Sequence, residues 1–240
     1  MEKVVYALWK PAALAADDYR AKLVAELAPA LAARGAIAVK VSAVDSAVAA
    51  GAKLRRDGGL PAKDALVSFW LEQSQDVGSC DALLAAHAAE RAGYLVVESR
   101  PLVNALHVVD PGERTPGFSL CTCITKRADL SHAEFLALWY GEQRACAIET
   151  QSTFAYVRNE VVRSLTPRAP DWTAIVEEGF PIEALADPEV FYDAKGDPAR
   201  LRANGARMFE TCQRFLDFER VSSHPMSQYR FVPAEHPLSG

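Results

Sequence analysis

The chain has no long apolar run and no dense patch of one charge. No stretch approaches the roughly 20 apolar residues that a membrane-spanning helix needs, and the amino-terminal "MEKVVYALWKP" lacks the apolar core of a signal peptide. The net charge is −5, and the densest basic run, "KLRRDGG" (53–59), indicates a solvated loop rather than a nucleic-acid surface. We therefore expect a cytoplasmic protein with no membrane and no nucleic-acid partner.

Sequence motifs for the common cofactors are also missing. The chain contains no phosphate-binding P-loop, no G-x-G-x-x-G and no G-x-S-x-G. The five histidines are scattered, without a His-x-His or His-x-x-x-His pair that would indicate a metal or haem ligand. One of them, His224, precedes a proline and is expected in a loop near the last strand. We predict no metal and no cofactor.

Cysteines are few and irregularly spaced. Five of them, an odd number, do not form the pattern of a disulfide framework. Cys121 and Cys123 would share one face of a strand, but no further ligands follow at a matching spacing. Two small core residues are therefore favoured over a metal pair.

Half of the chain is hydrophobic, and its order of segments occurs twice. A hydrophobic content of 50% can bury one large core or two small ones. Segments 10–44 and 126–161 align at an offset of 116 residues. The alignment places Tyr19 on Phe135, Leu23 on Trp139 and Leu27 on Gln143. Such self-similarity predicts an internal repeat.

Each half reads strand, helix, strand, strand, helix, strand, which is the ferredoxin-like order. The helices would cover one face of a four-stranded sheet, and the two apolar sheet faces would pack together. We predict an α+β fold with one repeat at 1–103, a turn-rich connector at 104–117 and a second repeat at 118–240. The second half is expected to carry the better pocket.

Local signals support the helices. Ser131 and Glu134 form a capping box, and Gly35 follows the last turn of the first helix at a favourable position. Pro29 is expected to kink that helix or to bring on its last turn.

Short motifs in both halves resemble the EthD-like family of dimeric α+β barrel proteins. Its members carry a phenylalanine, a tryptophan four residues on and a histidine four further, then a Tyr-x-x-Asn strand. Phe135, Trp139, Tyr156 and Asn159 match this order, and Ala-Pro at 28–29 matches in the first half. The resemblance implies an intramolecular barrel that binds a small apolar organic compound, which is aromatic, polyketide-like or an ether, in catabolism or secondary metabolism. A homodimer is one option.

The family histidine is replaced. Gln143 stands at its position in the second half and Leu27 in the first. Glutamine donates and accepts hydrogen bonds but does not titrate near neutral pH. Buried without partners, it would cost about 1–3 kcal/mol. It therefore either bonds a neighbour or orients a ligand.

The candidate site residues lie on or near the predicted helix that carries Gln143. Phe135 and Trp139 form either plain core or the wall of an apolar pocket, together with Trp172 and Phe180. The catalytic candidates are Tyr156, Glu177 and Glu178. Adjacent glutamates on a strand point to opposite faces, so one of them would point inward, where burial could raise its pKa; a solvated strand end is the alternative.

Two functions remain open from the sequence. The first is an enzyme that converts its compound by cofactor-free proton transfer or elimination. The second is a non-enzymatic accessory or small-molecule-binding protein of a catabolic pathway, which the missing histidine favours. The substrate, the reaction and the oligomeric state are not indicated.

Overall fold

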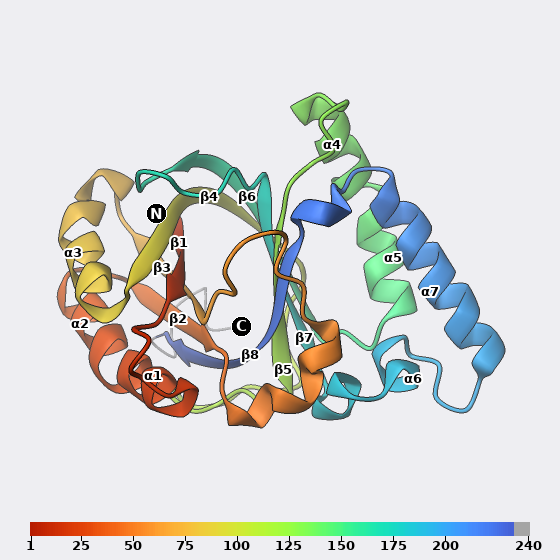
Figure 1. Ribbon diagram of the computed structural model, residues 1–240, viewed down its shortest axis with the longest axis horizontal. Helices are drawn as coiled ribbons and strands as arrows, with labels where there is room; N and C mark the ends of the chain where they lie inside the picture. The colour runs from red at the N-terminus through yellow and green to blue at the C-terminus, as the bar shows by residue number, and fades with distance from the viewer. Residues whose placement is uncertain (233–240) are drawn as a thin grey trace.

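Eight antiparallel strands close into one barrel (Figure 1). The structure, a computed structural model, describes residues 1–232. The strands are β1 (Glu2–Trp9), β2 (Ala38–Ala43), β3 (Ala65–Leu71), β4 (Glu90–Leu102), β5 (Phe118–Ile124), β6 (Ala155–Ser164), β7 (Ala174–Phe180) and β8 (Ser222–Phe231). Their order around the barrel is β1-β3-β2-β8-β5-β7-β6-β4. The α+β fold is confirmed, and the strand orders β4-β1-β3-β2 and β8-β5-β7-β6 correspond between the two halves.

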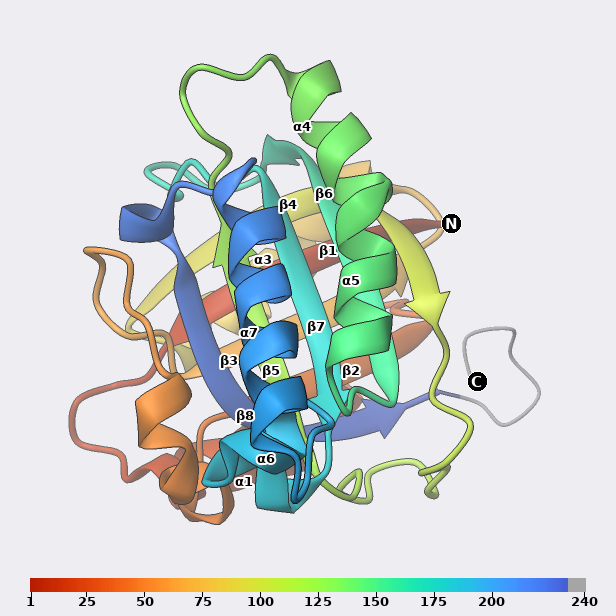
Figure 2. The same ribbon diagram turned by 90° about the vertical axis from the view of Figure 1, so that its right-hand side faces the viewer.

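Two layers of helices cover opposite sides of the barrel (Figures 1 and 2). The first layer is α1 (Ala16–Lys22), a π-helical turn (Leu23–Leu27), α2 (Ala28–Ala33) and α3 (Val77–His87). The second layer is α4 (His132–Tyr140), α5 (Glu142–Thr150), α6 (Pro188–Phe191) and α7 (Pro198–Gln213). Within residues 1–232, none of these helices combines the length and the apolar character needed to cross a bilayer.

Pro29 does not end the first helix. The five residues Leu23–Leu27 widen into a π-helical turn, and the backbone N–H of Ala28 donates to the Leu23 carbonyl. This local rearrangement accommodates a proline ring that would clash inside a regular helix. The helix then continues to Ala33, and Gly35 follows with φ 94°, the left-handed conformation expected after a helix end.

Gly141 divides the helix that was predicted to begin at the capping box. The capping box of Ser131 and Glu134 is present, but the backbone breaks at Gly141, with φ −81° and ψ −105°. A Cβ there would lie 2.7 Å from the Ala137 carbonyl oxygen. Trp139 and Gln143 consequently lie on two helices, α4 and α5, instead of on consecutive turns of one.

One end of the barrel is closed by a buried lysine. Lys63, ahead of β3, donates from Nζ to the Ser222 carbonyl at 2.8 Å and lies 2.8 Å from His224 Nδ1. His224 Nε2 lies 2.9 Å from Asp57 Oδ1. Because an ammonium has only donors, Nδ1 accepts and Nε2–H donates to Asp57. His224 belongs to strand β8. The prediction that it lies in a loop is wrong.

The side chain of Glu178 points from the barrel toward the second helical layer. Glu178 on β7 is opposite Tyr156 on β6 in the register of the two strands. Burial raises the pKa of Glu178 to about 7. The folded protein therefore keeps a proton on Glu178 at pH values where the unfolded chain has released it.

Replacing Glu178 should flatten the dependence of stability on pH. Between the usual pKa of 4.5 and the folded value of about 7, only the folded state holds the proton, so the stability of the native protein falls as pH rises. Glu178→Gln should remove this loss and raise the free energy of unfolding at pH 8 by about 1–3 kcal/mol. Urea denaturation at pH 5 and pH 8 measures the change. Glu210→Gln, at an exposed position of α7, is the matched control. If the wild type and Glu178→Gln showed the same dependence of stability on pH, Glu178 would not be protonated in the folded state.

Candidate functional site

The barrel interior consists of an apolar part and a polar part. Alternate residues of each strand point inward. Toward the end that Lys63 closes, the interior is apolar, with Val5, Ala7, Leu66, Ala92, Tyr94, Val96, Cys121, Cys123, Trp172, Ile175 and Met226. Toward the other end every strand contributes a polar side chain. We call this set the polar cup: Lys3, Lys40, Ser68, Glu98, Arg100, Ser119, Asn159, Glu177, Gln228 and Arg230.

Strand periodicity places these charges inside. In β1, Val4, Tyr6 and Leu8 pack against the first helical layer, so Lys3 shares the opposite, inward face with Val5. In β2, Val39 and Val41 belong to the same outer core. Lys40 between them therefore points into the barrel, where the helices cannot cover it.

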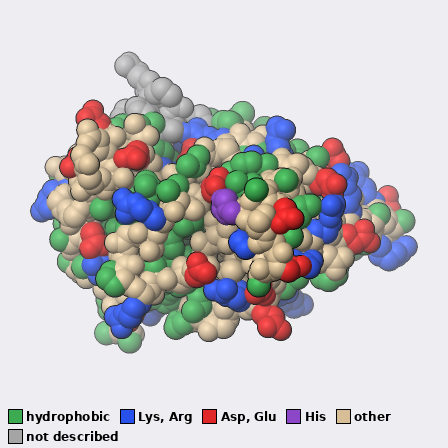
Figure 3. Space-filling view, turned by 90° about the horizontal axis from the view of Figure 1, so that it is seen from above, with side chains coloured by type: hydrophobic (Ala, Val, Ile, Leu, Met, Phe, Trp, Pro, Cys, Tyr) green, Lys and Arg blue, Asp and Glu red, His purple; other side chains and the backbone are tan. Residues whose placement is uncertain are grey.

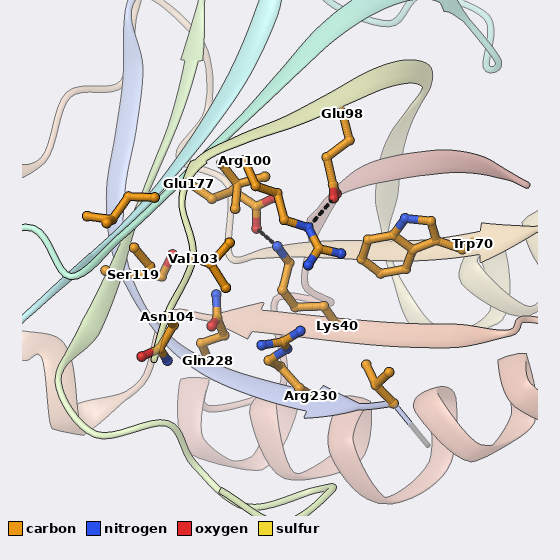
Figure 4. Close-up of a pocket in the computed structure, with 15 residues that line it drawn as sticks. Lys40, Trp70, Glu98, Arg100, Val103, Asn104, Ser119, Glu177, Gln228 and Arg230 are labelled. Atoms are coloured by element: carbon orange, nitrogen blue, oxygen red, sulfur yellow. Dashed lines mark hydrogen bonds and ion pairs between the residues drawn. The ribbon is translucent and has the colours of Figure 1, made fainter. Parts of the chain in front are cut away.

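Two lysines hold Glu177 at the centre of the cup, and Figure 4 shows one of them, Lys40. Lys40 Nζ lies 2.6 Å from Glu177 Oε2, and Lys3 Nζ lies 3.3 Å from Glu177 Oε1. Lys3 also lies 2.5 Å from Glu98 Oε2. The side chain of Asn159 donates to Glu177 Oε1 at 3.1 Å. All of these except Glu98, which is partly buried, are at most 7% exposed, so the cluster is shielded from water.

The surroundings shift the proton affinities of this cluster. Burial alone would raise the pKa of Glu177, but Lys40 and Lys3 outweigh it and hold that pKa at about 2. Burial lowers the pKa of Lys40, although Glu177 partly opposes this. A carboxylate is thus kept ionised beside an amine that releases its proton more readily than a surface lysine.

The cup contains a cavity and unsatisfied polar atoms. The cavity has a volume of about 50 Å³, and Lys40, Trp70 and Arg230 contribute to its lining. Ser68 Oγ and Asn159 Oδ1 are buried and have no hydrogen-bond partner within residues 1–232. Unsatisfied buried oxygens are costly. The cup therefore holds unsatisfied buried oxygens as well as a cavity.

The connector between the two halves borders the cup. Val103 and Asn104, directly after β4, line the cavity together with Val232 beyond β8. The next residues of the connector, with Arg230, line an adjoining cavity of about 200 Å³. The cup thus lies between the connector and the end of β8 (Figure 4).

Only one of the predicted catalytic residues lies in the cup. Glu177 points into the barrel and Glu178 to the helical side, as strand alternation predicted. Tyr156 is on the helical side as well, in one core cluster with Phe135 and Trp139. The wall of the barrel therefore separates Glu177 from these aromatic residues.

The remaining predicted residues lie in three other places. Gln143 on α5 is buried, and its Nε2 lies 3.2 Å from the sulfur of Met208 on α7. Trp172 is inside the apolar part of the barrel, with its ring 5.4 Å from that of Tyr94. Phe180 packs on the helical side, 4.6 Å from the ring of Phe191. The structure does not gather these residues around one cavity.

Several cup residues were not among the predicted ones. Lys3, Lys40, Glu98 and Arg230 were missed, although a lysine inside the apolar strand "AVKVSA" is a detectable signal. The cavity is lined by residues of both halves, such as Lys40 and Glu177. The second half was expected to carry the better pocket, and this cavity belongs to both halves, because closure of the barrel brings their inward faces together.

A cation site of the usual kind is not formed. Within residues 1–232, no group of three or more histidine, cysteine, aspartate or glutamate side chains is arranged to hold a metal ion. The lysines and arginines of the cup place positive charge there instead.

Comparison with known proteins identifies the fold. No protein-family model matches the chain, and no curated protein matches it significantly. Among solved structures, an anthrone oxidase-like protein superposes with a TM-score of 0.56 at 12% identity, over 97% of this chain and 91% of that one. A dye-decolorizing peroxidase from Bacteroides thetaiotaomicron gives 0.47 at 10% identity, over 95% and 93% of the two chains. A chlorite dismutase variant from Candidatus Nitrospira defluvii gives 0.47 at 12%, over 97% and 91%. At these identities the likeness to the first of them shows an α+β barrel fold and no more.

Proposed function

We propose that the chain binds a small organic molecule in the polar cup and converts it by proton transfer without a cofactor. The observation that carries the proposal is the buried pair of Lys40 and Glu177, 2.6 Å apart, at a cavity of the barrel. Charged groups buried together at a cavity are typical of sites that bind or move protons. The apolar walls of that cavity, Trp70, Val103 and Val157, suit the carbon skeleton of such a molecule.

Lys40 is the group that moves the proton. In its neutral form the Lys40 amine accepts a proton from an acidic C–H or O–H of the substrate; that bond breaks, and an N–H bond forms. The electron pair stays on the substrate as an enolate or phenolate, next to the cations of the cup. Glu177, held ionised, orients Lys40 and stabilises its ammonium form. Return of the proton to another substrate atom, or loss of a leaving group, completes an isomerisation or an elimination.

The resemblance to EthD-like proteins supports an aromatic, polyketide-like or ether compound and a role in catabolism. The name of the anthrone oxidase-like protein agrees with an aromatic substrate. The corresponding strand orders of the halves support two ferredoxin-like repeats, at 1–103 and 118–240 around the connector 104–117. We also propose that the protein is cytoplasmic.

A homodimer would use the side of the barrel between the helical layers. Val97 on β4 and Val162 on β6 are 56% and 55% exposed there. Figure 3 looks onto this side, where hydrophobic side chains lie among charged ones. A second copy of the chain would cover these apolar side chains, and we therefore propose a homodimer.

The alternative function is binding without conversion. Gln143 and Leu27 at the family histidine positions favour it, as does the small volume of about 50 Å³. An alternative position for the ligand is the interface of α4 and α5 with the barrel. Gln143 Oε1 has no hydrogen-bond partner there within residues 1–232, and the pKa of Glu178 is raised to about 7 by burial.

The substitution of Lys40 by arginine tests the proton transfer. Arginine keeps the positive charge beside Glu177 but does not release its proton. We expect Lys40→Arg to retain ligand binding and to lower kcat by at least about 100-fold, the usual contribution of a general base. Turnover of phenols, cyclic ketones and aryl ethers, followed by chromatography, measures this. Lys195→Arg, at an exposed position outside the barrel, is the control. Undiminished turnover by Lys40→Arg would contradict the role of Lys40, and binding without any turnover across the panel would favour the accessory function.

The substitution of Gln143 by leucine distinguishes the two positions for the ligand. If the ligand lies in the cup, Gln143→Leu should leave its dissociation constant unchanged within about twofold, because the barrel wall separates this residue from the cavity. If it lies beneath α4 and α5, the loss of one buried polar contact should weaken binding by about 1–3 kcal/mol. Ligand titration together with the melting temperature of the variant decides between them. A large fall in melting temperature with unchanged binding would assign Gln143 a structural role.

A further inference from the structure

We infer that Asn159 is a positioning residue, which occupies one oxygen of the Glu177 carboxylate and thereby limits the hold of that carboxylate on the proton of Lys40. The inference rests on the proposed function, in which the neutral amine of Lys40 takes a proton from the substrate, and it adds the residue that favours this neutral form. Asn159 itself does not line the cavity that Glu177 and Lys40 border, so it acts through Glu177 and not on the ligand.

The amide of Asn159 is fixed by two acceptors on the neighbouring strand. Asn159 on β6 and Ile175 on β7 are partners in the strand register. Asn159 Nδ2 donates to the Ile175 carbonyl at 3.0 Å and to Glu177 Oε1 at 3.1 Å. A carbonyl and an ionised carboxylate only accept hydrogen bonds, so the nitrogen of the amide, and not its oxygen, faces them. The side chain therefore ties the carboxylate of Glu177 to the backbone of β7.

The oxygen of this amide is left without a partner. Asn159 is 0% exposed, and its Oδ1 has no hydrogen-bond partner within residues 1–232. A buried acceptor without a partner is costly, so packing alone does not explain an asparagine at this position. The part of the side chain that the fold uses is the donor, which reaches Glu177.

The two oxygens of Glu177 have different partners. Oε1 accepts from Asn159 and lies 3.3 Å from Lys3 Nζ, whereas Oε2 lies 2.6 Å from Lys40 Nζ. Only one oxygen of the carboxylate is therefore directed at Lys40. Burial alone would raise the pKa of Glu177, but the two lysines outweigh it, and the hydrogen bond from Asn159 lowers it further. The amide thus takes up part of the negative charge that would otherwise hold the Lys40 proton.

Several other charged groups surround Lys40. They are Lys3 on β1, Glu98 and Arg100 on β4, Glu177 on β7 and Arg230 on β8. Strand β5 adds the thiol of Cys121, which stays neutral because burial raises its pKa to about 12. Burial lowers the pKa of Lys40, Glu177 opposes this, and Lys3 lowers that pKa further. A neutral substitution of Asn159 leaves all of these groups in place, so a change in the proton affinity of Lys40 would report the loss of the amide donor.

The proton affinity of Lys40 in a variant of Asn159 tests the inference. In protein labelled with 13C-lysine, the Cε signal that disappears in Lys40→Arg belongs to Lys40. Its shift between pH 6 and pH 11 gives the pH at which the amine loses its proton. We expect Asn159→Leu, which has a similar shape and no donor, to raise this pH by about half a unit or more, an increase of about threefold in proton affinity. Asn204→Leu is the matched control, because Asn204 Nδ2 likewise donates to a backbone carbonyl, that of Tyr192, but lies on α7 outside the barrel.

The titration of Lys40 separates the possible outcomes. An unchanged or lower pH of deprotonation in Asn159→Leu would overturn the inference, as would an equal rise in Asn204→Leu. A fall in melting temperature without the rise would leave Asn159 a structural role only. If Asn159→Leu does not fold, Asn159→Ala, which cannot overpack the site, takes its place with the same expected rise.

Turnover distinguishes this inference from the proposed function. With any compound of the panel that is converted, the dependence of kcat/KM on pH should move to higher pH in Asn159→Leu, because it reports the base of the free enzyme. The rise in the titration of Lys40 without turnover of any compound would support the positioning of Glu177 by Asn159 and reject the proposed reaction.

Discussion

The closed barrel obliges every strand to bury one of its two faces inside. A sheet that closes on itself leaves no edge and no solvent-facing inner side, so a charged residue on that face must find its partner across the barrel. Glu177 finds Lys3 and Lys40, and Asn159 donates a hydrogen bond to it. Lys40 belongs to the first half of the chain and Glu177 to the second. The cluster therefore links the two halves from within, and removal of one member would leave a buried charge without its partner, which is strongly destabilising.

The two ends of the barrel provide partners for their buried charges in different ways. At the closed end, Lys63 contacts two neutral acceptors, Ser222 and the ring of His224. The carboxylate of Asp57 contacts the other nitrogen of that ring and does not reach Lys63 directly. Burial lowers the pKa of Lys63 and that of His224, the latter to about 3. At the cup, lysines and carboxylates meet directly and border a cavity. Similar residue types thus fill one end of the barrel and border a cavity at the other.

Local rules predicted most of the elements, whereas the barrel itself was expected only from the family resemblance. The capping box at Ser131 and the glycine at 35 follow from neighbouring residues, and both are present. The π-helical turn before Pro29 and the break at Gly141 depend on how the backbone relieves local clashes, which hydrophobic periodicity does not report. The pairing of β2 with β8 and of β4 with β6 joins residues more than 50 positions apart. No sequence pattern within a single strand specifies that pairing, and the cup exists only because of it.

The residues that carry the family resemblance and the residues of the cup lie on opposite sides of the barrel wall. Trp139 and Tyr156 pack between helices and strands, and Leu27 is buried in the corresponding layer of the first half. Leucine and glutamine at the positions where EthD-like proteins carry a histidine do not titrate near neutral pH, and Glu178 is the carboxyl group on this side whose pKa burial raises to about 7. Inside, strands β1, β2 and β7 carry buried lysines and a glutamate, which are costly to bury and are retained there only in mutual contact. This concentration of buried charge inside the wall is the reason for placing the proposed ligand in the interior of the barrel and not among the aromatic residues outside it.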